Sequence, residues 1–184
     1  MDEKSIIERI KGGDKEAYAL IVEKYKNQIF NICYHYLQNH HDANDAAQET
    51  FIKAYKSING FNFKSSFATY LVRIAINTSK DYYKKHKNQQ NNIDIDDENT
   101  PEIKDDKNTP EDNFEQKERQ KMVRDAISKL NKKHREMIIL RDLNGYSYQE
   151  IANALNISEG TVKSRINRAR EALKEIILKN GTFL

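Results

Sequence analysis

Both prolines of this 184-residue chain, Pro101 and Pro110, lie in one short stretch, and the long segments on either side contain none. Because proline interrupts helices, its absence leaves each segment free to form continuous helices. Apolar residues there recur at spacings of three and four, as on one face of a helix. In the first segment these are Ile6, Ile10, Ala17, Leu20, Ile21, Tyr25, Ile29, Ile32 and Tyr36. No alternating run indicates a strand, so we predict an all-α chain with roughly four helices on each side of the prolines.

The stretch that holds the prolines is strongly acidic. Basic residues number 14 against 10 acidic ones in residues 1–90, 2 against 10 in residues 91–115, and 15 against 8 in residues 116–184, which gives net charges of +4, −8 and +7. A segment with high net charge and few apolar residues cannot bury a core, so residues 91–115 are predicted to form a flexible linker. The chain is therefore predicted to consist of two small helical domains, residues 1–90 and 116–184, joined by this linker.

Composition excludes several classes of protein. With 38% hydrophobic and 32% charged residues, the chain contains no apolar run near the roughly 18 residues that span a membrane, and stable membrane insertion is not expected. Its charged N-terminus lacks the apolar core of a signal peptide, which predicts a cytoplasmic protein. The single cysteine, Cys33, excludes an internal disulfide and disfavours a cysteine metal cluster.

Catalytic motifs are not evident. The sequence shows neither a glycine-rich phosphate loop nor a nucleophile motif, so we expect no enzyme activity, small-molecule substrate or cofactor. His40 and His41 stand beside Asp42 and Asp45, but this region is predicted to be an exposed loop that enters a helix, and we expect no metal there.

The last part of the chain carries the signals of a helix-turn-helix. Ser147 and Glu150 form a capping box for a short helix, Tyr148 to Leu155, and after a turn at residues 156–157 Ser158 caps a second helix. On that helix one face is apolar and the other polar and basic, which suits the major groove of duplex DNA. The inward residues are Val162, Ile166, Ala169 and Leu173, and the outward ones are Lys163, Ser164, Asn167, Arg168 and Arg170.

Residues 61–88 interleave aromatic and cationic side chains, a mixture that suits single-stranded nucleic acid. The cations include Lys80 and Lys84. An alternative is that Phe67 and some of the tyrosines are core residues, since Phe67, Leu71, Ile74 and Thr78 share helical spacing.

Three segments, "DANDAAQETFIKAYKSINGF", "FATYLVRIAINTSKDY" and "SYQEIANALNISEGTVKSRINRARE", resemble bacterial RNA polymerase sigma factors of the extracytoplasmic-function (ECF) group in the sigma-70 family. The resemblance implies that residues 1–90 bind core polymerase and the promoter −10 element, and that residues 116–184 bind the −35 element. The implied partners are promoter DNA, the clamp helices of the largest polymerase subunit, the second-largest subunit, and an anti-sigma factor. The linker would then run through the RNA path of the polymerase as a nucleic-acid mimic; a solvated tether is the alternative.

The resemblance also assigns residues to each contact. The −35 contacts are Thr161, Lys163, Ser164, Arg165, Asn167 and Arg168. The −10 base pocket is Phe61, Asn62, Phe63, Lys64, Ser65 and Asn77, near Lys80 and Lys84. The polymerase contacts are Asp45, Gln48, Glu49, Ile52 and Lys53, although Glu49 and Lys53 alone would suggest a surface ion pair.

The chain departs from the family pattern at three places. Asn62-Phe63-Lys64 stands where many relatives carry an Arg-Gly-Asp/Glu-like segment, and loss of that glycine is expected to affect the loop. Tyr70 replaces a tryptophan and brings a hydroxyl that needs a partner, and Asn167 replaces an aromatic residue of several relatives. The competing hypothesis is a stand-alone helix-turn-helix regulator whose first domain senses a signal or dimerises.

Overall fold

The computed structural model describes residues 2–89 and 110–179, which form eight α-helices and no strand. The first module, residues 2–89, contains α1 (Glu3–Lys11), α2 (Lys15–Leu37), α3 (His40–Ser57), a 3₁₀ turn η1 (Ile58–Gly60) and α4 (Phe67–Gln89). The second module, residues 110–179, contains α5 (Pro110–Lys129), α6 (Lys132–Ile138), a π-helical turn η2 (Ile139–Leu143), α7 (Tyr148–Leu155) and α8 (Glu159–Lys179). The all-α prediction is confirmed for these residues, while the short turns η1 and η2 were not predicted.

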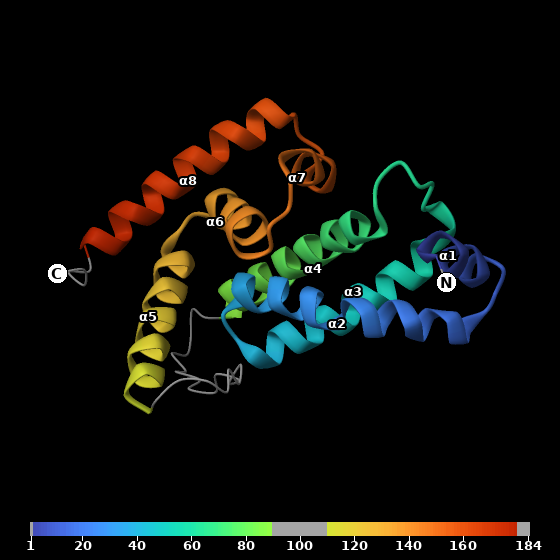
Figure 1. The fold of residues 1–184 in the computed structure, drawn as a ribbon, viewed down its shortest axis with the longest axis horizontal. Helices are drawn as coiled ribbons and strands as arrows, with labels where there is room; N and C mark the ends of the chain where they lie inside the picture. The colour runs from blue at the N-terminus through green and yellow to red at the C-terminus, as the bar shows by residue number, and fades with distance from the viewer. Residues whose placement is uncertain (1, 90–109, 180–184) are drawn as a thin grey trace.

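In the first module α2, α3 and α4 contact one another as a three-helix bundle, and α1 packs on α2 (Figure 1). The buried stripe of α2 is the one that its sequence period predicted, with two exceptions: Leu20 is 50% exposed, and Cys33 is buried although the period did not include it. The prediction for Leu20 is wrong because this residue lies roughly a third of a turn from the centre of the stripe. Phe67 is buried in the core, as the core alternative predicted. The hydroxyl of Tyr70 lies 2.6 Å from Ser57 Oγ, so it has the partner it needs.

The second module packs α8 against α5, α6 and α7. Helix α5 begins at Pro110, inside the stretch predicted as linker. Proline is favoured in the first turn of a helix, where its missing N–H leaves no bond unmade, and a helix start was therefore compatible with this sequence. The rest of the predicted linker, up to residue 109, lies outside the described residues.

The two modules share one continuous hydrophobic core, and α7 lies against α4 (Figure 1). Polar contacts also cross between them. Gln28 Nε2 donates to Tyr146 Oη at 2.8 Å, and Arg135 Nη1 donates to the carbonyl of Tyr36 at 3.2 Å. A third contact, the ion pair between Lys80 and Glu136, spans 3.0 Å. The boundary between the modules is therefore formed by side chains from both of them.

Within the described ranges, 2–89 and 110–179, no helix has the length and apolar character to cross a membrane. In the same ranges no three His, Cys, Asp or Glu side chains gather as metal ligands would.

Candidate nucleic-acid interface

The helix-turn-helix forms as its local signals predicted. Ser147 N–H donates to Glu150 Oε2 at 2.8 Å, and Glu150 N–H donates to Ser147 Oγ at 3.2 Å, which completes the capping box. Asn156 ends α7 in the left-handed conformation, with φ 54°. The chain then enters α8, where Thr161 N–H donates to Ser158 Oγ at 3.2 Å. These caps fix the angle at which α8 leaves the turn.

Helix α8 turns an apolar face inward and a polar face outward. Val162, Ile166 and Ala169 are buried, and Leu173 is half-buried against the core. The exposed residues are Lys163, Ser164, Asn167, Arg168 and Arg170. Asp142 pairs with Arg170, which raises the pKa of that guanidinium through their hydrogen bond and ties it to the rest of the module. The exposed face predicted to touch duplex DNA is therefore present and solvent-accessible.

Two residues assigned to the −35 contacts do not lie on the exposed face of α8. Thr161 is half-buried, and its hydroxyl lies 2.8 Å from Ser158 Oγ, within the helix cap. Arg165 is half-buried and lines a cleft between the modules. The outward set is thus Lys163, Ser164, Asn167 and Arg168, with Arg165 on the flank that faces the first module.

The loop between η1 and α4 divides its residues between core and solvent. Phe61 is 5% exposed, and its ring packs edge-on against Phe67 with the centroids 5.2 Å apart. Asn62, Phe63 and Lys64 are exposed, and Ser65 is half-buried. Asn62 Oδ1 accepts a bond from Lys64 N–H at 3.3 Å. Direct contact with a ligand is thus open to residues 62–65, while Phe61 supports them from the core.

Asn77 and Lys80 lie farther along α4, on the wall of the cleft. This cleft, of about 390 Å³, is lined from α4 by Arg73, Asn77 and Lys80, and from the second module by Lys132, Lys133, Glu136 and Arg165, among others. Five cations thus face one carboxylate, and Glu136 pairs with Lys80. Asn77 follows the start of α4 by ten residues, or about 15 Å of helix, so it is separated from the loop at residues 62–65. Lys84 is exposed, one turn beyond Lys80.

Sequence reasoning missed three cleft residues, Lys132, Lys133 and Glu136, whereas Arg73 belongs to the aromatic-basic stretch that the sequence had indicated. Only the adjacent Lys132-Lys133 pair, directly after the helix cap Asn131, offered a local signal of a basic surface. Glu136 gave none, because its role depends on a partner 56 positions away in the sequence.

Helix α3 presents a mixed charged and apolar surface. Glu49 Oε1 lies 2.8 Å from Lys53 Nζ, the ion pair that their spacing alone suggested, and Lys53 also donates to Thr78 Oγ1 at 3.2 Å. Asp45 and Gln48 are exposed, and Ile52 is 54% exposed. A single exposed isoleucine is common on protein surfaces and does not by itself mark a binding surface, so the assignment of this face to the polymerase stays a prediction.

The Glu49 carboxyl is held in its charged form. Its hydrogen bond with Lys53 lowers the pKa of Glu49, and a bond from Tyr82 adds to the effect. Partial burial and the Glu49 carboxylate together raise the pKa of Tyr82 to about 12. Glu49 is therefore an anion, and Tyr82 a neutral hydrogen-bond donor, at physiological pH.

Comparison with known families matches both modules. Residues 21–89 match the Sigma-70 region 2 model, and residues 120–173 match the Sigma-70, region 4 model. The chain is 37% identical over 182 residues to the ECF RNA polymerase sigma-E factor of Haemophilus influenzae, with 96% of each chain covered. This chain belongs to the ECF sigma factors. It is also 39% identical over 178 residues to the ECF RNA polymerase sigma factor SigW of Bacillus subtilis, with 94% of this chain and 95% of SigW covered.

Solved structures share the fold of this ECF sigma factor. CnrH, in complex with the cytosolic domain of CnrY, matches with a TM-score of 0.72 at 22% identity and covers 98% of this chain and 99% of its own. The sigma factor RpoE of Bartonella quintana, in complex with the anti-sigma factor NepR, matches with a TM-score of 0.68 at 23% identity, with 87% and 96% covered. The resemblance found in the sequence is confirmed, and the regulator with a sensor domain is not supported.

Proposed function

We propose that this ECF sigma factor binds core RNA polymerase in the cytoplasm and directs it to promoters, which it recognises and helps to open. The polymerase supplies the chemistry, so this chain needs no catalytic group or cofactor. The proposal is carried by the observation that this chain has two different surfaces suited to nucleic acid. One is the basic outward face of α8, and the other is the aromatic and basic loop before α4. Duplex and unpaired DNA are recognised by these two kinds of surface.

The second module, within residues 116–184, is proposed to read the −35 element as duplex. Lys163 and Arg168 extend from the outward face of α8, where cations can contact guanine edges or phosphates. Ser164 and Asn167 lie on the same face and offer hydroxyl and amide groups to base edges. Arg165 is proposed to contact phosphate from the flank of the helix, and Thr161 to support it through the cap.

The first module, residues 1–90, is proposed to hold unpaired bases of the −10 element. Asn62, Phe63, Lys64 and Ser65 would contact the flipped base, with Phe61 beneath them. Asn77, Lys80 and Lys84 would contact the strand farther along α4. Binding of unstacked bases offsets the few kcal/mol that opening the duplex costs. Because Lys80 pairs with Glu136, strand binding at Lys80 requires that ion pair to exchange for a phosphate.

The α3 surface is proposed to dock on the clamp helices of the largest polymerase subunit through Asp45, Gln48, Glu49, Ile52 and Lys53. The exposed Ile52 supplies apolar area, and the anionic Glu49 supplies charge. We further propose that the second-largest subunit contacts the chain and that an anti-sigma factor controls it. The similar fold of RpoE, which NepR binds in Bartonella quintana, supports the last point.

The test is in vitro transcription with purified core polymerase and a library of promoter DNA, with and without this protein. Transcripts that start at a discrete set of sites only when the protein is present would establish the function, and the enriched sequences would define both promoter elements. Duplex binding without promoter-specific initiation would instead favour a stand-alone regulator.

Arg168→Ala is expected to weaken binding to the recovered −35 duplex by about 1–3 kcal/mol if Arg168 contacts a base. If it contacts a phosphate, the slope of log affinity against log salt should fall by about one unit at every sequence. Fluorescence anisotropy with a labelled duplex measures both quantities. Lys174→Ala, an exposed change nearer the C-terminal end of the same helix, is the control, and equal effects of the two variants would remove Arg168 from the interface.

A further inference from the structure

Phe63 has a backbone conformation that aromatic residues rarely adopt. Its φ is 59°, in the left-handed region, where a bulky side chain is strained. Glycine reaches that conformation without strain because it has no Cβ, whereas phenylalanine does not. Such an outlier persists only where surrounding contacts hold it, and strain of this kind concentrates at functional sites.

The contacts that hold Phe63 come from within the loop and from α1. Its ring packs edge-on against Phe61, with centroids 4.9 Å apart. Lys11 Nζ lies 5.0 Å from the centroid of the Phe63 ring, and Lys4 Nζ lies 5.6 Å from it. The Lys11 ammonium also donates a hydrogen bond to the carbonyl of Phe61. Lys11 thus contacts the loop backbone and the Phe63 ring at once.

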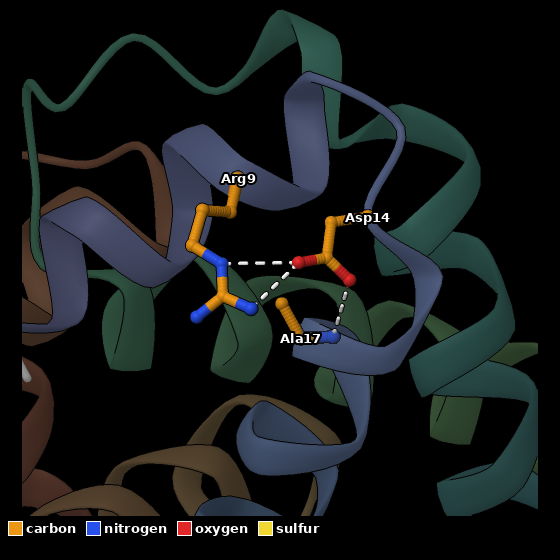
Figure 2. A network of polar contacts seen from close by, with 3 residues as sticks. All are labelled: Arg9, Asp14 and Ala17. Atoms are coloured by element: carbon orange, nitrogen blue, oxygen red, sulfur yellow. Dashed lines mark hydrogen bonds and ion pairs between the residues drawn. The ribbon is translucent and has the colours of Figure 1, made fainter.

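Helix α1 is itself fixed in place, which gives these lysines a defined position. Arg9 donates two hydrogen bonds to Asp14 Oδ2, at 3.0 Å from Nε and 2.7 Å from Nη2, across the turn between α1 and α2 (Figure 2). The other oxygen of Asp14 accepts from Ala17 N–H at 3.0 Å and so caps α2 (Figure 2). These bonds, with that of Ala17 first, lower the pKa of Asp14 and keep it charged.

Phe63 remains open to a ligand despite these contacts. It is 37% exposed, and it is flanked by the exposed polar residues Asn62 and Lys64. An aromatic ring accessible to solvent can stack with an unpaired base, and nearby ammonium groups can hold the adjacent phosphate. An alternative, that Phe63 simply completes the core, does not fit its exposure or its strained backbone.

We infer that Lys11, with Lys4, is a positioning residue that holds Phe63 in its left-handed conformation as the stacking platform for an unpaired base of single-stranded DNA. The inference rests on the proposed function and extends it to α1, which no motif in the sequence indicated. Because the phenylalanine side chain has no hydrogen-bonding group, Phe63 reads the base by stacking strength, and hydrogen bonds to the base edge come from the neighbouring polar residues Asn62, Lys64 and Ser65.

The test compares Lys11→Met with Lys11→Arg in polymerase holoenzyme on a promoter recovered from the library. Permanganate reactivity of unpaired thymines measures opening, and sequencing of transcripts from a randomised −10 element measures base preference at each position. Lys11→Met is expected to reduce opening by about fivefold, and to flatten the preference at one position, since it removes two cation–π contacts and a charged hydrogen bond. Lys11→Arg keeps the cation and should restore most of both.

The matched control is Lys26→Met, which removes an exposed lysine that forms an ion pair with Glu23, three positions earlier on α2. If Lys11→Met leaves base preference indistinguishable from that of Lys26→Met, the positioning role is excluded. A loss confined to thermal stability, with base preference intact, would likewise make Lys11 a structural residue only. Failure of the unmodified chain to give promoter-specific initiation would instead refute the proposed function itself.

Phe63→Gly supplies a second and independent test. Glycine adopts the left-handed conformation without strain, so the melting temperature of Phe63→Gly should not fall below that of the unmodified protein. Removal of the ring should nevertheless reduce both promoter opening and base preference. Unchanged base preference with Phe63→Gly would show that the ring is not the platform and would overturn the inference.

Discussion

Glu49→Lys is expected to abolish promoter-directed transcription while leaving the fold intact. Glu49 is an anion whose side chain is 40% exposed on α3, and reversing its charge places two cations next to each other on the proposed polymerase interface. The ion pair with Lys53 contributes only a few tenths of a kcal/mol to helix stability, and the hydrogen bond from Tyr82 contributes about 1 kcal/mol, so folding should survive the loss of both. Breaking a charge contact at a protein interface costs about 2–5 kcal/mol, roughly a thirtyfold to several-thousandfold loss of affinity.

The measurement is titration of fluorescently labelled protein with core polymerase, followed by transcription from a recovered promoter. Glu23→Lys is the matched control, because Glu23 also forms an exposed ion pair within one helix, with Lys26 at 2.8 Å. Binding of the −35 duplex should be normal in both variants. Equal affinity of Glu49→Lys and Glu23→Lys for core polymerase would show that Glu49 lies outside the interface.

The helix-turn-helix could be predicted to the residue because every signal that forms it is local. The capping box joins Ser147 and Glu150, three positions apart, and the buried face of α8 repeats every three or four residues. Such interactions depend on backbone geometry that any helix shares. The exposed face followed from the buried one, which is why Lys163 and Arg168 were placed correctly before the tertiary structure was known.

The surfaces made by distant segments could not be predicted in this way. The cleft between the modules brings Asn77 of α4 to Arg165 of α8, and its one carboxylate, Glu136, pairs with Lys80 across 56 positions. The loop is a similar case: the missing glycine was evident in the sequence, but the support that Lys11 gives to Phe61 from 50 positions away was not. Periodicity identifies which residues face inward, and only packing decides which of them meet.

Arg135→Met is expected to lower the free energy of unfolding by about 3 kcal/mol, because this guanidinium satisfies carbonyls that helix ends leave without partners. Arg135 is 4% exposed and donates to the carbonyls of Ile127, Ser128 and Leu130, at and just beyond the last turn of α5. Its Nη1 reaches the carbonyl of Tyr36, in the last turn of α2. One side chain thus caps a helix of each module, and methionine, of similar length, has no donor to replace it.

Thermal unfolding measures the effect, which corresponds to a fall of roughly 6–12 °C in the melting temperature for a chain of this size. Lys133→Met is the control, since Lys133 is an exposed cation on the same helix and lines the cleft without capping a helix. Equal melting temperatures for the two variants would exclude the capping role.

Arg135→Lys tests whether the positive charge or the shape of the guanidinium matters. A lysine ammonium can reach fewer of these carbonyls than the planar guanidinium with its five donors, so Arg135→Lys should recover less than half of the lost stability. Full recovery by lysine would mean that charge at the two helix ends, where carbonyl dipoles converge, suffices to hold the modules together.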